Sequence, residues 1–404
     1  TERVEEIAAR FDLGCSIVGE VTEGNYTCIF DGDVVADVPA DFLTDGALMH
    51  DLPAEAPAES ERDLPSPALE TAVEQVVKSP NTASREWVYR QYDHEVGLRT
   101  ALGPGDDSAV MAIHETEREG SGIGLALSAG AEPNWTAANP KAGAKAVALE
   151  NATNLTAKGA TPLAAVDCLN GGNPEKSDVY GGFSAIVDGL AEMCSVLSIP
   201  VVGGNVSLYN DSVSGPIPPT PTVAMVGARA GYDSPPTALT GDGTLLLVGD
   251  RALAERGRLG GSVYLDSFGG TDRFPTLPEN PKVFVETLAA VADDDETPAV
   301  HDVSHGGLCV TLAEMVSPSA GAVVELDTPA STAEALFHEQ PGRAVIETKN
   351  PAAVREAFAD VAPVHELGES TDTGTLELTV NDSGISVSAE TISDWRTILE
   401  REMA

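Results

Sequence analysis

Short apolar runs alternate with segments of helical spacing through most of the chain, and this alternation is the sequence feature that most restricts its fold. In the region 85–230, strand-like runs cover 123–127, 163–166, 199–202 and 222–226, and helical spacing covers 142–155 and 183–197. Strands that alternate with helices are typical of α/β folds, in which helices cover a sheet. We therefore predict an α/β domain with an antiparallel or mixed sheet between residues 85 and 230.

Composition divides the rest of the 404-residue chain into three further sections. Residues 1–50 hold one amphipathic segment and short β-rich runs, which predicts the closing part of a preceding domain. Proline, alanine, glutamate and serine dominate 51–84, as is typical of a linker, with one short helix near 68–77. After a stretch rich in proline and glycine, 240–404 opens on a Leu-Leu-Leu-Val run and alternates again. This last section predicts a second α/β domain.

Acidic residues outnumber basic ones along the whole chain. There are 64 Asp and Glu against 23 Lys and Arg, a formal charge of −41. This balance excludes nucleic acid as a partner, because phosphates need a basic surface. Repulsion on this scale destabilises a compact chain at low ionic strength, but molar salt shortens the Debye length to about 3 Å. We interpret the charge as that of a halophilic protein; an ordinary acidic protein is the alternative.

The sequence also bounds the compartment. No run of about 18 apolar residues and no charged-then-apolar leader occurs, which predicts a cytoplasmic protein with no membrane partner. The five cysteines are odd in number and lack CxxC spacing. This disfavours both a disulfide framework and a zinc knuckle, so we expect reduced thiols.

Polar residues follow two of the predicted strands. Asp167 comes directly after the run 163–166, and Gly204, Asn205 and Ser207 follow the next strand. Ligands of α/β sheets bind at the carboxyl ends of strands, so we expect these groups to converge on one polyphosphate pocket. Glycine lets a phosphate approach the backbone, an amide oxygen suits Mg²⁺, and a hydroxyl can donate to an anion. The alternative is a glycine-rich turn whose Asn and Ser bond to their own backbone.

Two other stretches carry candidate ligands. Asp106 and Asp107 lie in GPGDDSAV, which fits a hydrated metal beside a nucleotide or, equally, a solvated turn. His301 and His305 are four residues apart before the pair Gly306-Gly307, but no third metal ligand is evident. We therefore expect this loop to pack tightly onto the helix that follows it. Neither a P-loop nor a dinucleotide-binding GxGxxG signature is present.

Several stretches, in order and spacing, closely resemble one family. They are ENATNLTAKGATPLAAVDCLNGGNPEKSDVYGGF (150–183), VVGGNVSLYN, PTPTVAMVG, HDVSHGGL and AEALFHEQPGR. They resemble the C-terminal half of the large subunit of phosphoribosylformylglycinamidine synthase (the PurL family), over nearly the whole chain. The general plan is also similar to the wider superfamily of aminoimidazole ribonucleotide synthetase and thiamine-monophosphate kinase.

The resemblance implies an ATP-dependent ligase of purine biosynthesis with a PurM-like two-domain fold. Such an enzyme converts formylglycinamide ribonucleotide and glutamine-derived ammonia to the amidine, with ADP and phosphate as products. Its cofactors would be ATP and Mg²⁺, and its partners a glutaminase subunit (PurQ) and a small subunit (PurS).

Carried over by motif, Asp167 and Gly204 would contact ATP, Asn205 would bind Mg²⁺, and Ser207 would contact the ribonucleotide. Asp106 and Asp107 would form an auxiliary nucleotide or metal site. The catalytic groups of the family belong to its first half, so we expect this chain to be inactive alone.

The chain departs from the family pattern at SAGAEPN, residues 128–134. Gly130 stands where the resemblance leads us to expect an aspartate, and Asn134 where it leads us to expect an arginine. Three alternatives remain open. They are a small-molecule kinase of the same superfamily, a selenophosphate-type synthetase, which lacks its usual reactive cysteine here, and a structural half that holds a nucleotide without turnover.

Overall fold

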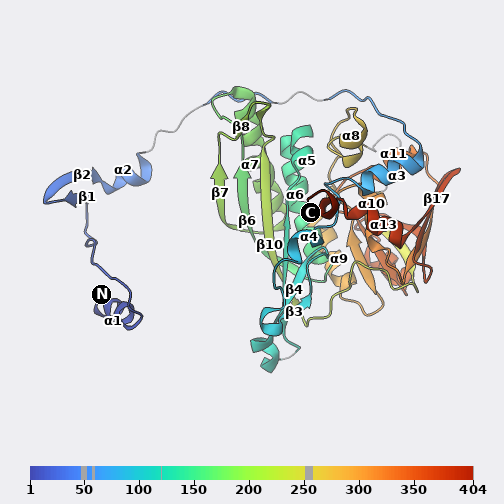
Figure 1. Ribbon diagram of the computed structural model, residues 1–404, viewed down its shortest axis with the longest axis horizontal. Helices are drawn as coiled ribbons and strands as arrows, with labels where there is room; N and C mark the ends of the chain where they lie inside the picture. Colours follow the sequence, from blue (N-terminus) through green and yellow to red (C-terminus); the bar gives the residue numbers. More distant parts are fainter. Residues whose placement is uncertain (47–51, 57–59, 120, 251–257, 404) are drawn as a thin grey trace. The chain divides into compact units, whose positions relative to one another are not determined.

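The computed structural model describes residues 1–46, 52–56, 60–119, 121–250 and 258–403. The chain divides into two compact units, Thr1–Leu52 and Pro53–Ala404. The first contains α1 (Glu2–Arg10), the antiparallel hairpin β1 (Asn25–Phe30) and β2 (Asp33–Pro39), and α2 (Ala40–Asp45) (Figure 1). None of its described residues is buried. This unit therefore has no core of its own in the part of the chain described.

A six-stranded mixed sheet forms the first half of the second unit. Its order is β3 (Thr100–Leu102), β4 (Ala109–Ile113), β5 (Ile123–Gly130), β10 (Thr220–Ala230), β6 (Thr161–Asn170) and β7 (Val201–Ser207). Neighbouring strands are antiparallel except β6 and β7, which are parallel. The predicted mixed sheet is thus confirmed, and β7 is an edge strand.

Helices α5 (Pro133–Ala138), α6 (Pro140–Thr156) and α7 (Ser177–Leu197) follow this sheet's strands. α6 begins at Asn139, whose side chain accepts a hydrogen bond from the backbone of Ala142, with proline in the first turn. Nearly every side of α6 is buried, because the helix lies between the two sheets of the unit (Figure 1). The buried face of β6, which includes Ala165 and Leu169, packs in the same core as α6 and α7.

A seven-stranded sheet forms the second half. Its order is β12 (Ala299–Asp302), β14 (Ala344–Thr348), β11 (Thr244–Val248), β15 (Val364–Thr371), β13 (Gly321–Leu326), β16 (Thr375–Val380) and β17 (Ser383–Ser388). Its helices are α8 (Val263–Phe268), α9 (Pro281–Ala292), α10 (Gly307–Met315), α11 (Thr332–Phe337), α12 (Pro351–Ala357), α13 (Ala389–Arg396) and α14 (Ile398–Met403). Leu149 of α6, Leu246 of β11 and Phe284 of α9 share one buried cluster. A continuous core therefore joins the two halves.

The expected linker 51–84 is wrong for its second part. Helix α3 (Leu69–Val77) buries Ala72, Val73, Val76 and Val77 in the core of the second half. It contacts α8, α10, α13 and β17. Its apolar pairs recur every four residues, which gives the helix one face to bury. Because that face packs in the core of the second half, α3 belongs to the second unit. Residues 47–51 and 57–59, at the expected boundary and in the linker, lie outside the described residues.

Short elements complete the second unit: α4 (Glu86–Tyr89), the 3-10 turns Val96–Leu98 and His114–Glu119, and the strand pair β8 (Asp211–Ser212) and β9 (Gly215–Pro216). Among the helices described, none combines the length and the apolarity that a membrane crossing requires.

Candidate functional site

The four residues predicted to bind ATP, Mg²⁺ and substrate lie on two adjacent parallel strands, β6 and β7. The register pairs Asp167 with Gly204, Cys168 with Asn205, and Asn170 with Ser207. The prediction placed these residues past the strand ends, but they lie within the strands. This is a correction: backbone pairing continues both strands beyond their apolar runs.

Asp167 and Gly204 share the face of the sheet that the helices cover. A Cβ atom on Gly204 would lie 2.4 Å from Asp167 Oδ1, so a larger residue here would require the carboxylate to move. Burial raises the pKa of Asp167. Burial also raises the pKa of the Cys194 thiol, on α7, to about 11, and the Asp167 carboxylate adds to that rise. Asp167 therefore faces α7.

Asn205 and Ser207 share the opposite, open face, because side chains alternate along a strand. Cys168 Sγ lies 3.9 Å from Asn205 Oδ1, and Asn170 Nδ2 lies 3.7 Å from the same sulfur. The expected pocket shared by a carboxylate, a carboxamide and an alcohol stays a prediction, and the register places its members on two faces of the sheet. The carboxylate points to the helices, whereas the carboxamide and the alcohol point away from them.

The turns that follow the two strands are bonded together. Gly171 N donates to Ser207 O at 2.9 Å, and Tyr209 N donates to Gly172 O at 3.0 Å. Ser207 Oγ accepts a hydrogen bond of 3.2 Å from Asn210 Nδ2. The sequence left open the alternative that Asn205 and Ser207 bond to their own backbone. Within the described residues, their side chains make no such bond.

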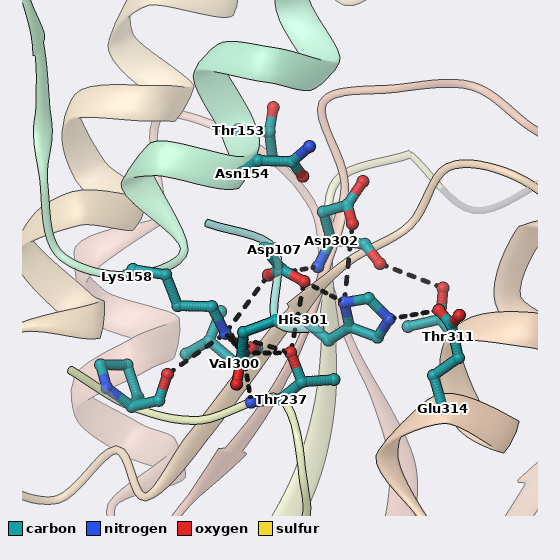
Figure 2. Close-up of polar contacts among 12 residues, drawn as sticks. Asp107, Thr153, Asn154, Lys158, Thr237, Val300, His301, Asp302, Thr311 and Glu314 are labelled. Atoms are coloured by element: carbon teal, nitrogen blue, oxygen red, sulfur yellow. Dashed lines mark hydrogen bonds and ion pairs between the residues drawn. The ribbon is translucent and has the colours of Figure 1, made fainter. Parts of the chain in front are cut away.

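Asp106 and Asp107 belong to a second group, the ion-pair cluster, which also contains Lys158, His301 and Glu314. Figure 2 shows Asp107, Lys158, His301 and Glu314 of this cluster. Lys158 Nζ lies 2.6 Å from Asp106 Oδ1 and 3.4 Å from Asp107 Oδ2, and its side chain is fully buried. It also donates to Val300 O at 2.9 Å and to Pro235 O at 3.2 Å. Because a buried ammonium holds both aspartates, this stretch is not a solvated turn.

His301 lies between two carboxylates. Its Nδ1 is 2.5 Å from Asp107 Oδ1, and its Nε2 is 2.7 Å from Glu314 Oε2 (Figure 2). Burial alone would lower the pKa of His301, but the two carboxylates raise it well above its ordinary value. Burial likewise opposes ionisation of Asp107, yet Lys158 and His301 hold its pKa at about 2. Each ring nitrogen of His301 therefore faces a carboxylate.

The auxiliary metal role of Asp106 and Asp107 stays a prediction. Ligand atoms of Asp107, His301 and Asp302 do lie within 4.8 Å of one another. In the structure, Lys158 lies against both aspartates and His301 lies against Asp107. His305 does not join His301: its ring packs on Trp135, with centroids 5.1 Å apart, as expected of tight loop packing.

Gly130 makes room for another carboxylate. A Cβ atom at this position would lie 2.8 Å from Glu150 Oε2 and 3.1 Å from Asn151 Nδ2. Burial, and then Asp302, raises the pKa of Glu150 well above its ordinary value. A side chain at position 130 would therefore require Glu150 to move. Asn134 has its backbone N–H bonded to Glu132 at the start of α5.

The ion-pair cluster borders a cleft of about 490 Å³. Basic and aromatic side chains also line it, among them Arg85, Tyr89, His305 and Arg396. Sequence reasoning missed Lys158, Glu314 and both arginines. Lys158, Glu314 and Arg396 meet their charged partners only through contacts between residues far apart in the sequence. The nearest signal was the acidic pair at 106–107, which demanded a counter-charge once buried.

Sequence models of the AIR synthase related family match both halves of the second unit. The N-terminal domain model covers residues 105–228, and the C-terminal domain model covers residues 242–381. The chain belongs to the AIR synthase related family. Both the family resemblance and the mixed α/β fold predicted from the sequence are thereby confirmed.

Relatives within this family extend over the whole chain. The PurL subunit of phosphoribosylformylglycinamidine synthase from Haloarcula marismortui is 61% identical over 408 residues, covering 100% of this chain and 56% of that protein. The PurL subunit of Methanosarcina acetivorans is 39% identical over 420 residues, with the same two coverages. The chain thus spans about half the length of the curated relatives it matches.

Solved structures of Thermotoga maritima PurL share the fold. The PurLQS structure matches 87% of this chain and 49% of its own, at 21% identity and a TM-score of 0.56. PurL complexed with FGAR matches 81% of this chain and 54% of its own, at 16% identity and a TM-score of 0.63. At these identities the likeness concerns the fold alone.

Proposed function

We propose that this chain is one half of a phosphoribosylformylglycinamidine synthase, a ligase that forms a C–N bond with glutamine as the nitrogen donor. The observation that carries the proposal is the 61% identity to a PurL subunit along the whole chain. The complete enzyme would convert formylglycinamide ribonucleotide, ATP and ammonia to the amidine, ADP and phosphate. Because the chain spans half of such relatives, we expect the other half to complete the site.

Asn205 is the residue of this chain that we propose as a Mg²⁺ ligand, and Ser207 as a contact for the ribonucleotide. Asn205 fits, since its amide oxygen is a neutral hard ligand on the open face of an edge strand. Mg²⁺, when bound, would neutralise charge on the transferred phosphoryl group. Asp167 and Gly204 remain our proposed ATP contacts. Because Asp167 lies on the other face, ATP would have to cross the edge of the sheet at β7.

The decisive test of the Mg²⁺ role is Asn205→Ala in the complete enzyme, together with a magnesium titration. We expect lower turnover and a weaker dependence on magnesium. Asn173→Ala is the matched control, since Asn173 lies in the turn after β6 and its side chain accepts only from Glu175 N among described residues. An unchanged magnesium titration in the Asn205 variant would remove Asn205 from the metal site.

The partners and catalytic groups of the proposed enzyme lie outside this chain. One of the Thermotoga maritima structures is that of PurLQS, which supports a glutaminase subunit and a small subunit as partners here. Purified chain given ATP, Mg²⁺, substrate and ammonia should make no amidine, whereas the complete enzyme should. Synthesis by the chain alone would contradict the proposal.

The second candidate function is a structural half that holds a nucleotide without turnover. The cleft beside the ion-pair cluster favours it, because Arg85, Arg396 and His305 offer positive or donor groups to phosphates. A nucleotide would then copurify with the chain and leave slowly. Chromatography of the supernatant after acid denaturation measures this, and a nucleotide-free protein would rule the candidate out.

We also propose that the protein works in a salt-rich cytoplasm. A charge of −41 requires screening, and relatives from Haloarcula, Natronomonas and Halobacterium species match the whole chain or nearly so. The urea midpoint of unfolding should rise steeply as KCl increases toward molar concentrations. A midpoint independent of KCl would contradict this proposal.

A further inference from the structure

The side-chain amide of Asn210, in the turn after β7, contacts the hydroxyl of Ser207. Its Nδ2 has two protons and lies near three acceptors, Gly171 O at 3.0 Å, Ser207 O at 3.0 Å and Ser207 Oγ at 3.2 Å, so the two acceptors on Ser207 share one proton. Its backbone N–H also donates to Gly171 O, at 3.1 Å. One residue thus joins the turn after β7 to the turn after β6 and contacts the side chain proposed to meet substrate.

This contact fixes the direction of the Ser207 proton. A serine hydroxyl has one proton and two lone pairs. Because the amide of Asn210 donates to the oxygen, one lone pair is used, and the proton must point elsewhere. Among the described residues, Ser207 Oγ has no other hydrogen bond. The proton is therefore free to be donated to a ligand on the open face of β7.

The backbone beside Asn210 is held in an unusual conformation. Tyr209 has a φ of 62°, a region that costs a bulky residue about 1–2 kcal/mol. The bond from Tyr209 N to Gly172 O and the two bonds from Asn210 to Gly171 O fix this turn. Such strain persists only where surrounding contacts impose it, and here it aims the Asn210 amide at Ser207.

We propose that Asn210 is a positioning residue of the ligase, which sets the Ser207 hydroxyl as a hydrogen-bond donor to an anionic oxygen of the ribonucleotide, such as its phosphate. The inference rests on the proposed function, in which Ser207 contacts this substrate. Asn210 itself does not touch substrate.

The test is a double-mutant cycle between Asn210→Asp and Ser207→Ala in the complete enzyme. A carboxylate at position 210 accepts the Ser207 proton instead of donating, so the hydroxyl turns away from the ligand. We expect Asn210→Asp to raise KM for the ribonucleotide by about tenfold or more, as the loss of a hydrogen bond to a charged group does. The value of kcat should change much less, because this contact is made in both the ground and transition states.

Two controls separate positioning from charge and folding. Asn173→Asp places the same charge in the neighbouring turn, and KM should stay within about twofold of the parent enzyme. Asn210→Ser removes the amide without adding charge, and it replaces Asn210→Asp in the cycle should the latter fail to fold. Thermal unfolding of each variant, compared with the parent, shows which are folded.

In the Ser207→Ala background, Asn210→Asp should leave KM almost unchanged, because the group that it positions is gone. If Ser207→Ala itself leaves KM unchanged, the substrate role of Ser207 fails, and this inference fails with it. If Ser207→Ala raises KM and Asn210→Asp raises it by the same factor in both backgrounds, the positioning role of Asn210 is overturned while the proposed function stands.

Discussion

Lys158→Met should destabilise the protein strongly, because it removes the buried cation that contacts Asp106 and Asp107 and leaves only His301 beside Asp107. Lys158 Nζ contacts Asp106 at 2.6 Å and Asp107 at 3.4 Å from a fully buried position. Methionine fills a similar volume, so the change removes the charge and its hydrogen bonds without opening a large cavity.

The expected loss of unfolding free energy at pH 7 is about 3–5 kcal/mol, the usual cost of removing one partner of a buried ion pair. The pKa of Asp107 gives a second measure. Lys158 and His301 hold it at about 2 against an ordinary 3.8, and that difference corresponds to about 2 kcal/mol in all. Because this pKa is lowered, the stabilisation is present above pH 4 and lost as the pH falls toward 2. The deficit of the variant should therefore shrink in that range.

Urea unfolding in molar KCl, followed by tryptophan fluorescence, measures both effects, since Trp135 is fully buried. Lys78→Met is the matched control: Lys78 pairs with Glu74 at 3.5 Å on the surface of α3, and its loss should cost less than about 0.5 kcal/mol. Adding Asp106→Asn to Lys158→Met should recover part of the deficit. If Lys158→Met lies within about 1 kcal/mol of the control at pH 7, or its deficit is unchanged at pH 3, the buried-pair reasoning fails.

Two further predictions concern β6, β7 and the thiols. Gly204→Ala should lower the unfolding free energy by about 1–3 kcal/mol, because its Cβ would lie 2.4 Å from Asp167 Oδ1; a smaller loss in an Asp167→Ala background would identify that contact as the cause, and equal losses would exclude it. Burial raises the pKa of Cys194 to about 11 and that of Cys309 to about 12, so in the native protein a disulfide reagent should modify exposed Cys15 first. If Cys194 and Cys309 react in the native protein as fast as they do in urea, the burial of these two thiols is contradicted.

The apolar pattern was sufficient to predict the strands and helices of the central region. β5, α6, β6, α7 and β10 all lie where periodicity placed them, because each buries one face or all of itself. Strand ends were less predictable. β6 continues through Asp167 to Asn170 because the ladder to β10 and β7 extends there, and hydrogen-bond pairing leaves no trace in hydrophobicity.

The ion-pair cluster was beyond prediction from local sequence. Lys158 meets a carbonyl at position 300, and His301 meets a carboxylate at position 107. No spacing rule links positions so far apart, so the acidic pair 106–107 remained compatible with a metal site or a solvated turn. The packing of α6 against β12 brings Lys158 and His301 to this acidic pair. The internal salt bridge that results is visible only in the folded structure.

The arrangement on β6 and β7 depends on register, a property that no single strand encodes. In parallel strands, paired residues share a face, so a shift of one residue would pair Asp167 with Asn205 and bring carboxylate and amide together. The observed register instead pairs Asp167 with Gly204 and Cys168 with Asn205. It therefore places on one face the carboxylate and the glycine opposite it, and on the other the amide and the hydroxyl. If the family roles hold here, the edge of β7 at Gly204 is where a single ligand reaches both faces, because no side chain blocks it there.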